Sequence, residues 1–351
     1  MRYVRIKNLK PGDVVHESIH DMHNRLLVAS GEALSEFKIK KLQQLGFDGF
    51  YIETELTKDI QITDLIPNQL RYKAISDLRN MNIASTIDNA KEIVDNVLSK
   101  KDIFIDYIDV RNYENELFQH SIFVAESSIV IGSALGLNKN QLTELAVAAL
   151  LHDIGKLFKE PKFMKKIAES KTVEEYNEEM HPLYGFRLFK NDSDYGVNAI
   201  VNKAILTHHI NENGTGTTGS LKYDSLIKET PLYAKIINVV NVYDKKRHTA
   251  EIGSPSEAIE HLKGGYGTLY NPEVVRCFLN HIAIYPTGTT VTLSNGIQGI
   301  VYSQTKGFPE RPKIKLETGQ ILDLMTRFMQ TITIVGTDFD NDRDQEIGKS
   351  R

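Results

Sequence analysis

Apolar residues recur along the chain at two different spacings, and the change of spacing divides the chain into parts. Near the N-terminus, residues 3–6 and 26–29 alternate at the period of two that is typical of strands. Apolar side chains over residues 35–46 follow helical spacing, and residues 50–52 are expected to return as a strand. The pattern therefore predicts a small α/β unit over residues 1–55, which we interpret as a regulatory domain.

Helical spacing dominates the middle of the chain. An amphipathic stripe over residues 85–99 lies in a polar segment, 56–105, that is expected to be a helical connector. The next region, 106–283, is helical almost throughout. Its predicted helices cover residues 115–134, 139–152, 182–188, 197–209, 231–243, 256–263 and 272–282. Proline suits the first helical turn at three of these starts, Pro231, Pro255 and Pro272. The fold class is thus expected to be mainly α, with an all-helical bundle as its main domain.

The strand period returns near the C-terminus. Residues 290–293 alternate and run into Asn295-Gly296, a pair that strongly favours a hairpin. Further strands are expected at 299–302, 312–316 and 331–335. We therefore predict a small β-barrel-like subdomain over residues 284–337, followed by a charged tail, 338–351.

Composition excludes several classes of protein. Of the 351 residues, 42 are Lys or Arg and 46 are Asp or Glu, so the formal charge of −4 argues against a duplex nucleic acid as partner. A single cysteine, Cys277, excludes an internal disulfide or a thiolate-rich zinc site, and it is compatible with a cytoplasmic location. The sequence predicts neither a signal peptide nor a membrane span.

Histidines in the predicted helical body gather with carboxylates at helix ends and on apolar helix faces. The positions are Glu116, His120, His152, Asp153, His181, His208, His209 and Asp244. Imidazole and carboxylate are ligands of divalent metals such as iron, manganese and zinc. Five histidines and three carboxylates exceed the needs of one tetrahedral ion, and they suit two or three octahedral ions that share a bridging Asp. Paired metals lower the pKa of a bridging water and contact the oxygens of a phosphoryl group. Lys156, one turn after Asp153, could offset the charge of a phosphate.

Each of these residues also has a structural interpretation. Glu116 and His120 could form an exposed pair within one helix, and a lone His208 or Asp244 could be a satisfied group at a helix end. The histidines near the N-terminus, His16, His20 and His23, are expected to be solvated loop residues rather than metal ligands. The joint order of the residues in the helical body favours a metal phosphohydrolase.

The motifs of the helical body resemble the HD-GYP family, a subset of HD-domain metal hydrolases that cleave cyclic di-GMP. The matching segments are Glu116-x-x-x-His120-Ser121, His152-Asp153-Ile154-Gly155-Lys156, His181-Pro182-x-x-Gly185, His208-His209, Asn213-Gly214-Thr215-Gly216 and the helix from Ala234 to Asp244. They occur in the family's order over about residues 110–283.

The resemblance implies an HD-domain helical bundle with two or three divalent metals, most often iron or manganese. The ligands that it implies are His120, His152, Asp153, His181, His208, His209 and Asp244, with Glu116 at a third metal. In this interpretation Asp153 bridges the metals and helps to hold the attacking hydroxide, and Lys156 contacts a substrate phosphate. The implied reaction is hydrolysis of cyclic di-GMP to pGpG, and the resemblance leaves open whether hydrolysis continues to GMP.

The chain departs from the family in the loops. Thr217 and Thr218 stand at the Tyr and Pro of the family signature, and Ile210 and Asn213 replace a usual Glu and Asp. After Asp244 the family's Ala-Leu-Thr-Ser-x-Arg is replaced by Lys-Lys-Arg-His-Thr, in which Arg247 is the candidate for binding substrate phosphate.

These changes leave alternatives open. The chain could be a weak or inactive cyclic-dinucleotide sensor that signals through protein contacts, or a phosphohydrolase of another nucleotide. A homodimer or a signalling-protein partner is compatible with either.

Overall fold

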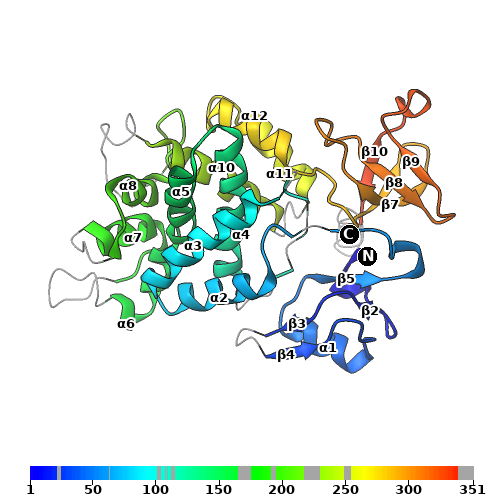
Figure 1. The fold of residues 1–351 in the computed structure, drawn as a ribbon, viewed down its shortest axis with the longest axis horizontal. Coiled ribbons are helices and arrows are strands. Elements are labelled where there is room, and N and C mark those ends of the chain that lie inside the picture. The colour runs from blue at the N-terminus through cyan, green and yellow to red at the C-terminus, as the bar shows by residue number, and fades with distance from the viewer. Residues whose placement is uncertain are drawn as a thin grey trace, which may run out of the picture.

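Three structural units make up the chain in the computed structural model, which describes residues 1–21, 25–62, 64–100, 104–106, 108, 110–111, 115–164, 175–190, 195–216, 230–248 and 254–338. A helical body fills one side of the molecule, and the N-terminal unit and a C-terminal sheet lie together at the other side (Figure 1). None of the helices in these ranges combines the length and the apolar character that a bilayer crossing requires.

The N-terminal unit is built on a three-stranded antiparallel sheet with the order β1 (Arg2–Arg5), β5 (Gly49–Glu53), β2 (Val14–Val15). A two-stranded ribbon, β3 (Ile19–His20) with β4 (Leu26–Val28), and one helix, α1 (Glu36–Gln44), complete the unit. Ser35 caps α1 by accepting a hydrogen bond from the Lys38 N–H. The strands and the helix predicted for this region are confirmed, and their apolar side chains form a core of their own.

The helical body contains most of the buried side chains. Its α-helices are α2 (Asn68–Arg79), α3 (Ile83–Leu98), α4 (Glu116–Ala134), α5 (Lys139–Leu151), α6 (Pro161–Met164), α7 (His181–Lys190), α8 (Ala199–Thr207), α10 (Leu232–Arg247), α11 (Pro255–Gly264) and α12 (Pro272–His281). A short 3-10 helix, η3 (Ile154–Lys159), continues from the end of α5, and another, η4 (Glu178–Met180), leads into α7. The predicted helices of the bundle are confirmed, with ends that shift by a few residues.

Two central helices, α4 and α5, are buried on nearly every side. Such all-round burial explains why these segments are apolar without a strong one-sided stripe. The helices α2 and α3 pack on them, and side chains such as Leu70 and Ile93 join the same core. The segment predicted as a connector is therefore part of the helical body. The sequence did not single out α2 because its hydrophobic positions are interrupted by polar residues.

The C-terminal unit is a five-stranded antiparallel sheet. Its strand order is β10 (Ile334–Thr337), β6 (Thr290–Leu293), β7 (Gln298–Ser303), β8 (Lys313–Leu316), β9 (Ile321–Asp323). The predicted Asn-Gly hairpin joins β6 and β7, and Gly296 has the positive φ of 83° that this turn requires. The predicted strands are confirmed and β9 is additional, whereas closure into a barrel is not shown. Of the predicted tail, residues 339–351 lie outside the described residues.

Polar contacts join the three units through the segment before α4. The hydroxyl of Tyr51 accepts a hydrogen bond from the Ile108 N–H at 2.8 Å. Both oxygens of Asp106 accept hydrogen bonds from the backbone and hydroxyl of Thr287, and Gln304 donates a third. Burial nevertheless raises the pKa of Asp106 to about 7. The segment that enters the helical body is thus fixed to both smaller units.

Candidate metal centre

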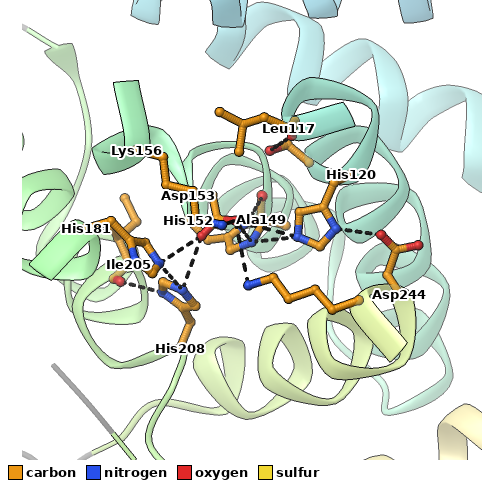
Figure 2. A network of polar contacts seen from close by, with 12 residues as sticks. Leu117, His120, Ala149, His152, Asp153, Lys156, His181, Ile205, His208 and Asp244 are labelled. Atoms are coloured by element: carbon orange, nitrogen blue, oxygen red, sulfur yellow. Dashed lines mark hydrogen bonds and ion pairs between the residues drawn. The ribbon is translucent and has the colours of Figure 1, made fainter. Parts of the chain in front are cut away.

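Asp153 lies at the centre of a group of buried histidines, at the point where α5 ends and η3 begins (Figure 2). Its Oδ1 is 3.0 Å from Nε2 of His181 and 3.6 Å from Nε2 of His208. Its Oδ2 is 3.4 Å from Nε2 of His152 and 3.7 Å from Nε2 of His120. The carboxylate therefore divides its two oxygens between two pairs of imidazoles that come from four different helices or helix ends.

Three of these imidazoles are oriented by the backbone of their own segment. The Nδ1 atom of each lies 2.7 Å from the carbonyl oxygen three residues earlier: Ala149 for His152, Glu178 for His181 and Ile205 for His208. A carbonyl oxygen can only accept a hydrogen bond, so each Nδ1 carries the proton. In the neutral imidazole the lone pair of each Nε2 then faces the Asp153 carboxylate, which is the tautomer that metal-ligating histidines adopt.

The Nε2 atoms of two of these histidines also lie close to one another. Nε2 of His181 is 3.4 Å from Nε2 of His208, and among the described residues Asp153 Oδ1 has no hydrogen-bond donor. Burial lowers the pKa of His208 to about 3, and burial lowers that of His209 well below its usual value. Neutral imidazoles and a carboxylate that converge in this way repel unless a cation lies among them. The donor set therefore fits divalent metal ions.

His120 is oriented by a carboxylate instead of a carbonyl. Its Nδ1 is 2.5 Å from Oδ2 of Asp244, which leaves Nε2 directed at His152, 3.2 Å away. The guanidinium of Arg111 contacts both oxygens of Asp244, at 2.8 and 2.9 Å, and Arg247 contacts Oδ1 at 3.0 Å. Burial would raise the pKa of Asp244, but the two arginines hold it well below its usual range. Asp244 is thus an ionised acceptor for the His120 N–H.

An aromatic ring stabilises the positive charge of the arginines beside Asp244. The guanidinium carbon of Arg247 lies 4.1 Å from the ring centroid of Phe123, and that of Arg111 lies 5.8 Å from the same centroid. Both arginine side chains are only 4% exposed. Arg247, predicted to bind substrate phosphate, is placed by the structure inside the protein and against Asp244.

Two lysines approach Asp153 from different elements. Nζ of Lys156, from η3, donates to Oδ2 at 2.6 Å, and Nζ of Lys245, from α10, lies 3.9 Å from the same oxygen. Burial would raise the pKa of Asp153, but the positive charge of Lys245 and contacts with His152 and Lys156 hold it well below its usual range. The carboxylate is therefore ionised and available as a ligand.

Glycine is required where the chain passes between two of the ligands. A Cβ on Gly155 would lie 1.9 Å from the carbonyl oxygen of His181, so no larger residue fits without moving the start of α7. Gly216 has a φ of 110°, and a Cβ there would lie 2.0 Å from the carbonyl oxygen of His209. These two close approaches explain glycine in the His-Asp-Ile-Gly-Lys segment and in the loop after the paired histidines.

The structure gathers most of the predicted ligands into two groups that share Asp153. One group is Asp153 with His181, His208 and His209, and the other is Asp153 with His120 and His152; the ligand atoms of each lie within 4.8 Å of one another. Asp244 contacts the second group through His120. Glu116 is exposed in the first turn of α4 and lies outside both groups.

Sequence reasoning missed Arg111 and Lys245. Arg111 contacts a residue 133 positions away, and no local pattern could reveal that pairing. Lys245 had a usable signal, because it follows Asp244 directly at a position where the resembled family has alanine. The sequence nevertheless could not tell whether its side chain reaches the centre.

Other histidines and loop residues have simpler roles. His16 pairs with Glu53 at 2.5 Å, and His20 lies 3.2 Å from the hydroxyl of Tyr72, while His23 lies outside the described residues. Ile210 is buried and pairs with Gly216 in a β-bridge. The substituted signature positions, Thr217 and Thr218, also lie outside the described residues.

Comparison with known proteins identifies relatives of the helical body. Residues 102–274 match the family model described as the HD domain. Residues 102–274 are thus similar to HD domains, and the curated relatives agree with the sequence resemblance to the HD-GYP family.

Three of these relatives are curated proteins. Cyclic di-GMP phosphodiesterase PA4108 of Pseudomonas aeruginosa is 26% identical over 74% of this chain and 64% of its own length. Cyclic di-GMP phosphodiesterase PdeB of Borreliella burgdorferi is 26% identical over 58% of this chain and 53% of its own. A cyclic di-GMP phosphodiesterase of Thermotoga maritima is 30% identical over 47% of this chain and 44% of its own. The chain spans less than two thirds of the length of each of them.

Proposed function

We propose that the chain is a metal-dependent phosphodiesterase that hydrolyses cyclic di-GMP to pGpG and then to GMP. The observation that carries the proposal is the division of the Asp153 carboxylate between two groups of histidines, because a bridging carboxylate is what a paired metal centre requires. The names of the matched relatives support cyclic di-GMP as the substrate.

The proposal assigns two divalent ions, iron or manganese, to the two groups. One ion would be held by His120, His152 and Asp153, and the other by Asp153 together with His181, His208 and His209. Imidazole with carboxylate is a donor set that both metals accept. Asp244 is assigned to the orientation of His120, because both of its oxygens already contact guanidinium groups.

When bound, the two ions would supply Lewis acidity at the phosphodiester and lower the pKa of a water. The chain's own residues would bind the phosphate and orient the metal ligands. Lys156 is 19% exposed and its ammonium group lies at the edge of the centre, so it can donate to a non-bridging phosphate oxygen. The histidines are held in one tautomer by groups that do not change during the reaction, so little reorganisation is needed.

The direct test is a product assay with metal analysis. Full-length protein would be loaded separately with iron under anaerobic conditions and with manganese, and then incubated with cyclic di-GMP. We expect about two metals per chain and the appearance of pGpG, whereas Asp153→Ala should show neither. Metal-loaded protein that binds cyclic di-GMP and releases no product with either metal would overturn the proposal.

A cytoplasmic location is part of the proposal. It is supported by Cys277, which is a free thiol on α12.

A further inference from the structure

Lys245 brings a second ammonium group to the metal centre. It is the residue that follows Asp244 on α10, and its Nζ lies 3.9 Å from Oδ2 of Asp153. Lys156 reaches the same oxygen from η3, at 2.6 Å. The Lys245 side chain is 40% exposed, so it is more accessible to solvent than Lys156, whose side chain is 19% exposed. Two lysines from separate elements therefore converge on one carboxylate oxygen.

One carboxylate cannot serve both lysines while it also binds metals. Lys156 is within hydrogen-bond distance of Asp153, whereas Lys245 is beyond it. The other carboxylate near Lys245, that of Asp244, is already paired with two arginines. Once the Asp153 oxygens are committed to metal ions, the Lys245 ammonium group faces the centre without a matching negative charge. An anion bound there would supply it.

We propose that Lys245 is a second substrate-binding cation, which acts with Lys156 on the phosphodiester that is hydrolysed. The inference rests on the proposed function and adds a contact to it. Because both Nζ distances are measured to one oxygen, a single phosphate group can reach both lysines. An ammonium group is a compact charge with three donors, which suits a non-bridging phosphate oxygen. The terminal phosphate of the linear product carries more negative charge than the cyclic diester, so the product should depend on Lys245 more strongly.

The experiment compares Lys245→Ala with Lys246→Ala in the metal-loaded, full-length protein. Lys246 is the next residue on α10, so its replacement removes the same charge from the same helix. Four quantities are measured: metal per chain, KM and kcat for cyclic di-GMP, and the equilibrium Kd of pGpG at two salt concentrations.

We expect Lys245→Ala to keep the wild-type metal content, to raise KM by about tenfold and to weaken pGpG binding by more than that, because a charge-assisted hydrogen bond is lost. Its binding should also depend less on salt. Lys246→Ala should stay within about twofold of wild type in all four quantities.

Two outcomes would overturn the assignment. Lys245→Ala could match Lys246→Ala in KM and in pGpG binding, which would leave Lys245 outside the substrate site. It could instead bind metal more tightly with unchanged nucleotide binding, which would make Lys245 a competitor of the metal. In either case wild-type protein that still releases pGpG would preserve the proposed function, whereas wild-type protein that neither binds nor cleaves cyclic di-GMP would refute both.

Discussion

Asp244 holds the imidazole of His120 while it neutralises buried arginines: its Oδ2 is 2.5 Å from His120 Nδ1, and Arg111 contacts both of its oxygens. The orientation of one proposed ligand and the compensation of buried charge thus depend on the same carboxylate. A change at Asp244 should therefore affect metal binding and stability together.

We expect Asp244→Asn to lose metal and to be destabilised by about 3 kcal/mol or more, because an amide NH₂ must face either the His120 N–H or a guanidinium group. Metal analysis and thermal unfolding would measure the two effects. Asp95→Asn is a suitable control, since Asp95 forms a surface pair with Lys139 and is 57% exposed. An Asp244→Asn protein with full metal content and the melting temperature of the control would contradict the role given to Asp244.

Asp153→Ala and Glu116→Ala should differ sharply in metal content. Asp153 belongs to both groups of ligands, so its loss should empty the centre, whereas Glu116 is exposed and belongs to neither. Elemental analysis of the two purified variants would measure their metal content per chain. If Glu116→Ala lost one metal per chain, a third ion of the kind implied by the family resemblance would have to be added at the start of α4.

Replacement of Gly155 by Ala should damage the centre through the backbone. The new Cβ would lie 1.9 Å from the His181 carbonyl oxygen, so the start of α7 and its ligand must move. We expect a loss of about 3 kcal/mol of stability and weaker metal binding, measured by unfolding and by metal titration. Gly264→Ala is the matched control, because nothing lies within 4 Å of its Cβ position. Equal behaviour of the two variants would count against this explanation of the glycine.

Lys156→Ala should retain its metals and lose turnover. Lys156 is not among the grouped ligands, but its ammonium group is positioned for a phosphate, and removal of one such contact typically costs about 10²- to 10³-fold in rate. The measurement is kcat/KM for cyclic di-GMP beside metal content. Lys162→Ala, with a side chain that is 67% exposed, should behave as wild type. Loss of metal in Lys156→Ala would instead assign the lysine a structural role at Asp153.

Asp106 should make the protein less stable in alkaline solution. Its pKa is raised from 3.8 to about 7 in the folded state, so the folded chain holds a proton that the unfolded chain has released. The stability that this group contributes is complete below the unfolded pKa and is lost as pH rises through about 7, by at most about 4 kcal/mol.

Thermal unfolding at about pH 5.5 and about pH 8.5 would detect this loss. Asp106→Asn can accept from the Thr287 N–H and from Gln304 while it donates to the Thr287 hydroxyl, so it mimics the protonated form and should remove the alkaline loss. Asp59→Asn should not, because Asp59 is exposed and its salt bridge to Lys315 lowers its pKa. An unchanged pH dependence in Asp106→Asn would assign the loss of stability at higher pH to other groups.

Local patterns in the sequence were sufficient for most elements of the fold. Helices with regular apolar spacing, such as α12, and the hairpin at Gly296 were predicted because their signals lie within a few residues. The role of α2 was not predicted, since its place in the core depends on α4, about 50 residues later. Closure of the C-terminal strands is a property of tertiary packing that alternation alone cannot specify.

The site shows the same division between local and distant information. The histidines and Asp153 stand in recognisable motifs, so the residues that the structure brings together at the centre were predicted from the sequence. The partners that orient or neutralise them were predicted less well. Arg111 belongs to no motif, because it contacts Asp244 only in the folded chain. Arg247 was expected to bind substrate, because its contact with the Phe123 ring could not be predicted from the sequence.

The carbonyl groups that orient His152, His181 and His208 have a consequence for variation in this chain. Each is a backbone group three residues before its histidine, so no side-chain substitution can remove it. The ligand geometry is therefore insulated from side-chain changes in the surrounding loops that leave the backbone path intact, such as those at Ile210 and Asn213. Loops around such a centre can acquire new residues, and with them new specificity, while the metal ligands keep their orientation.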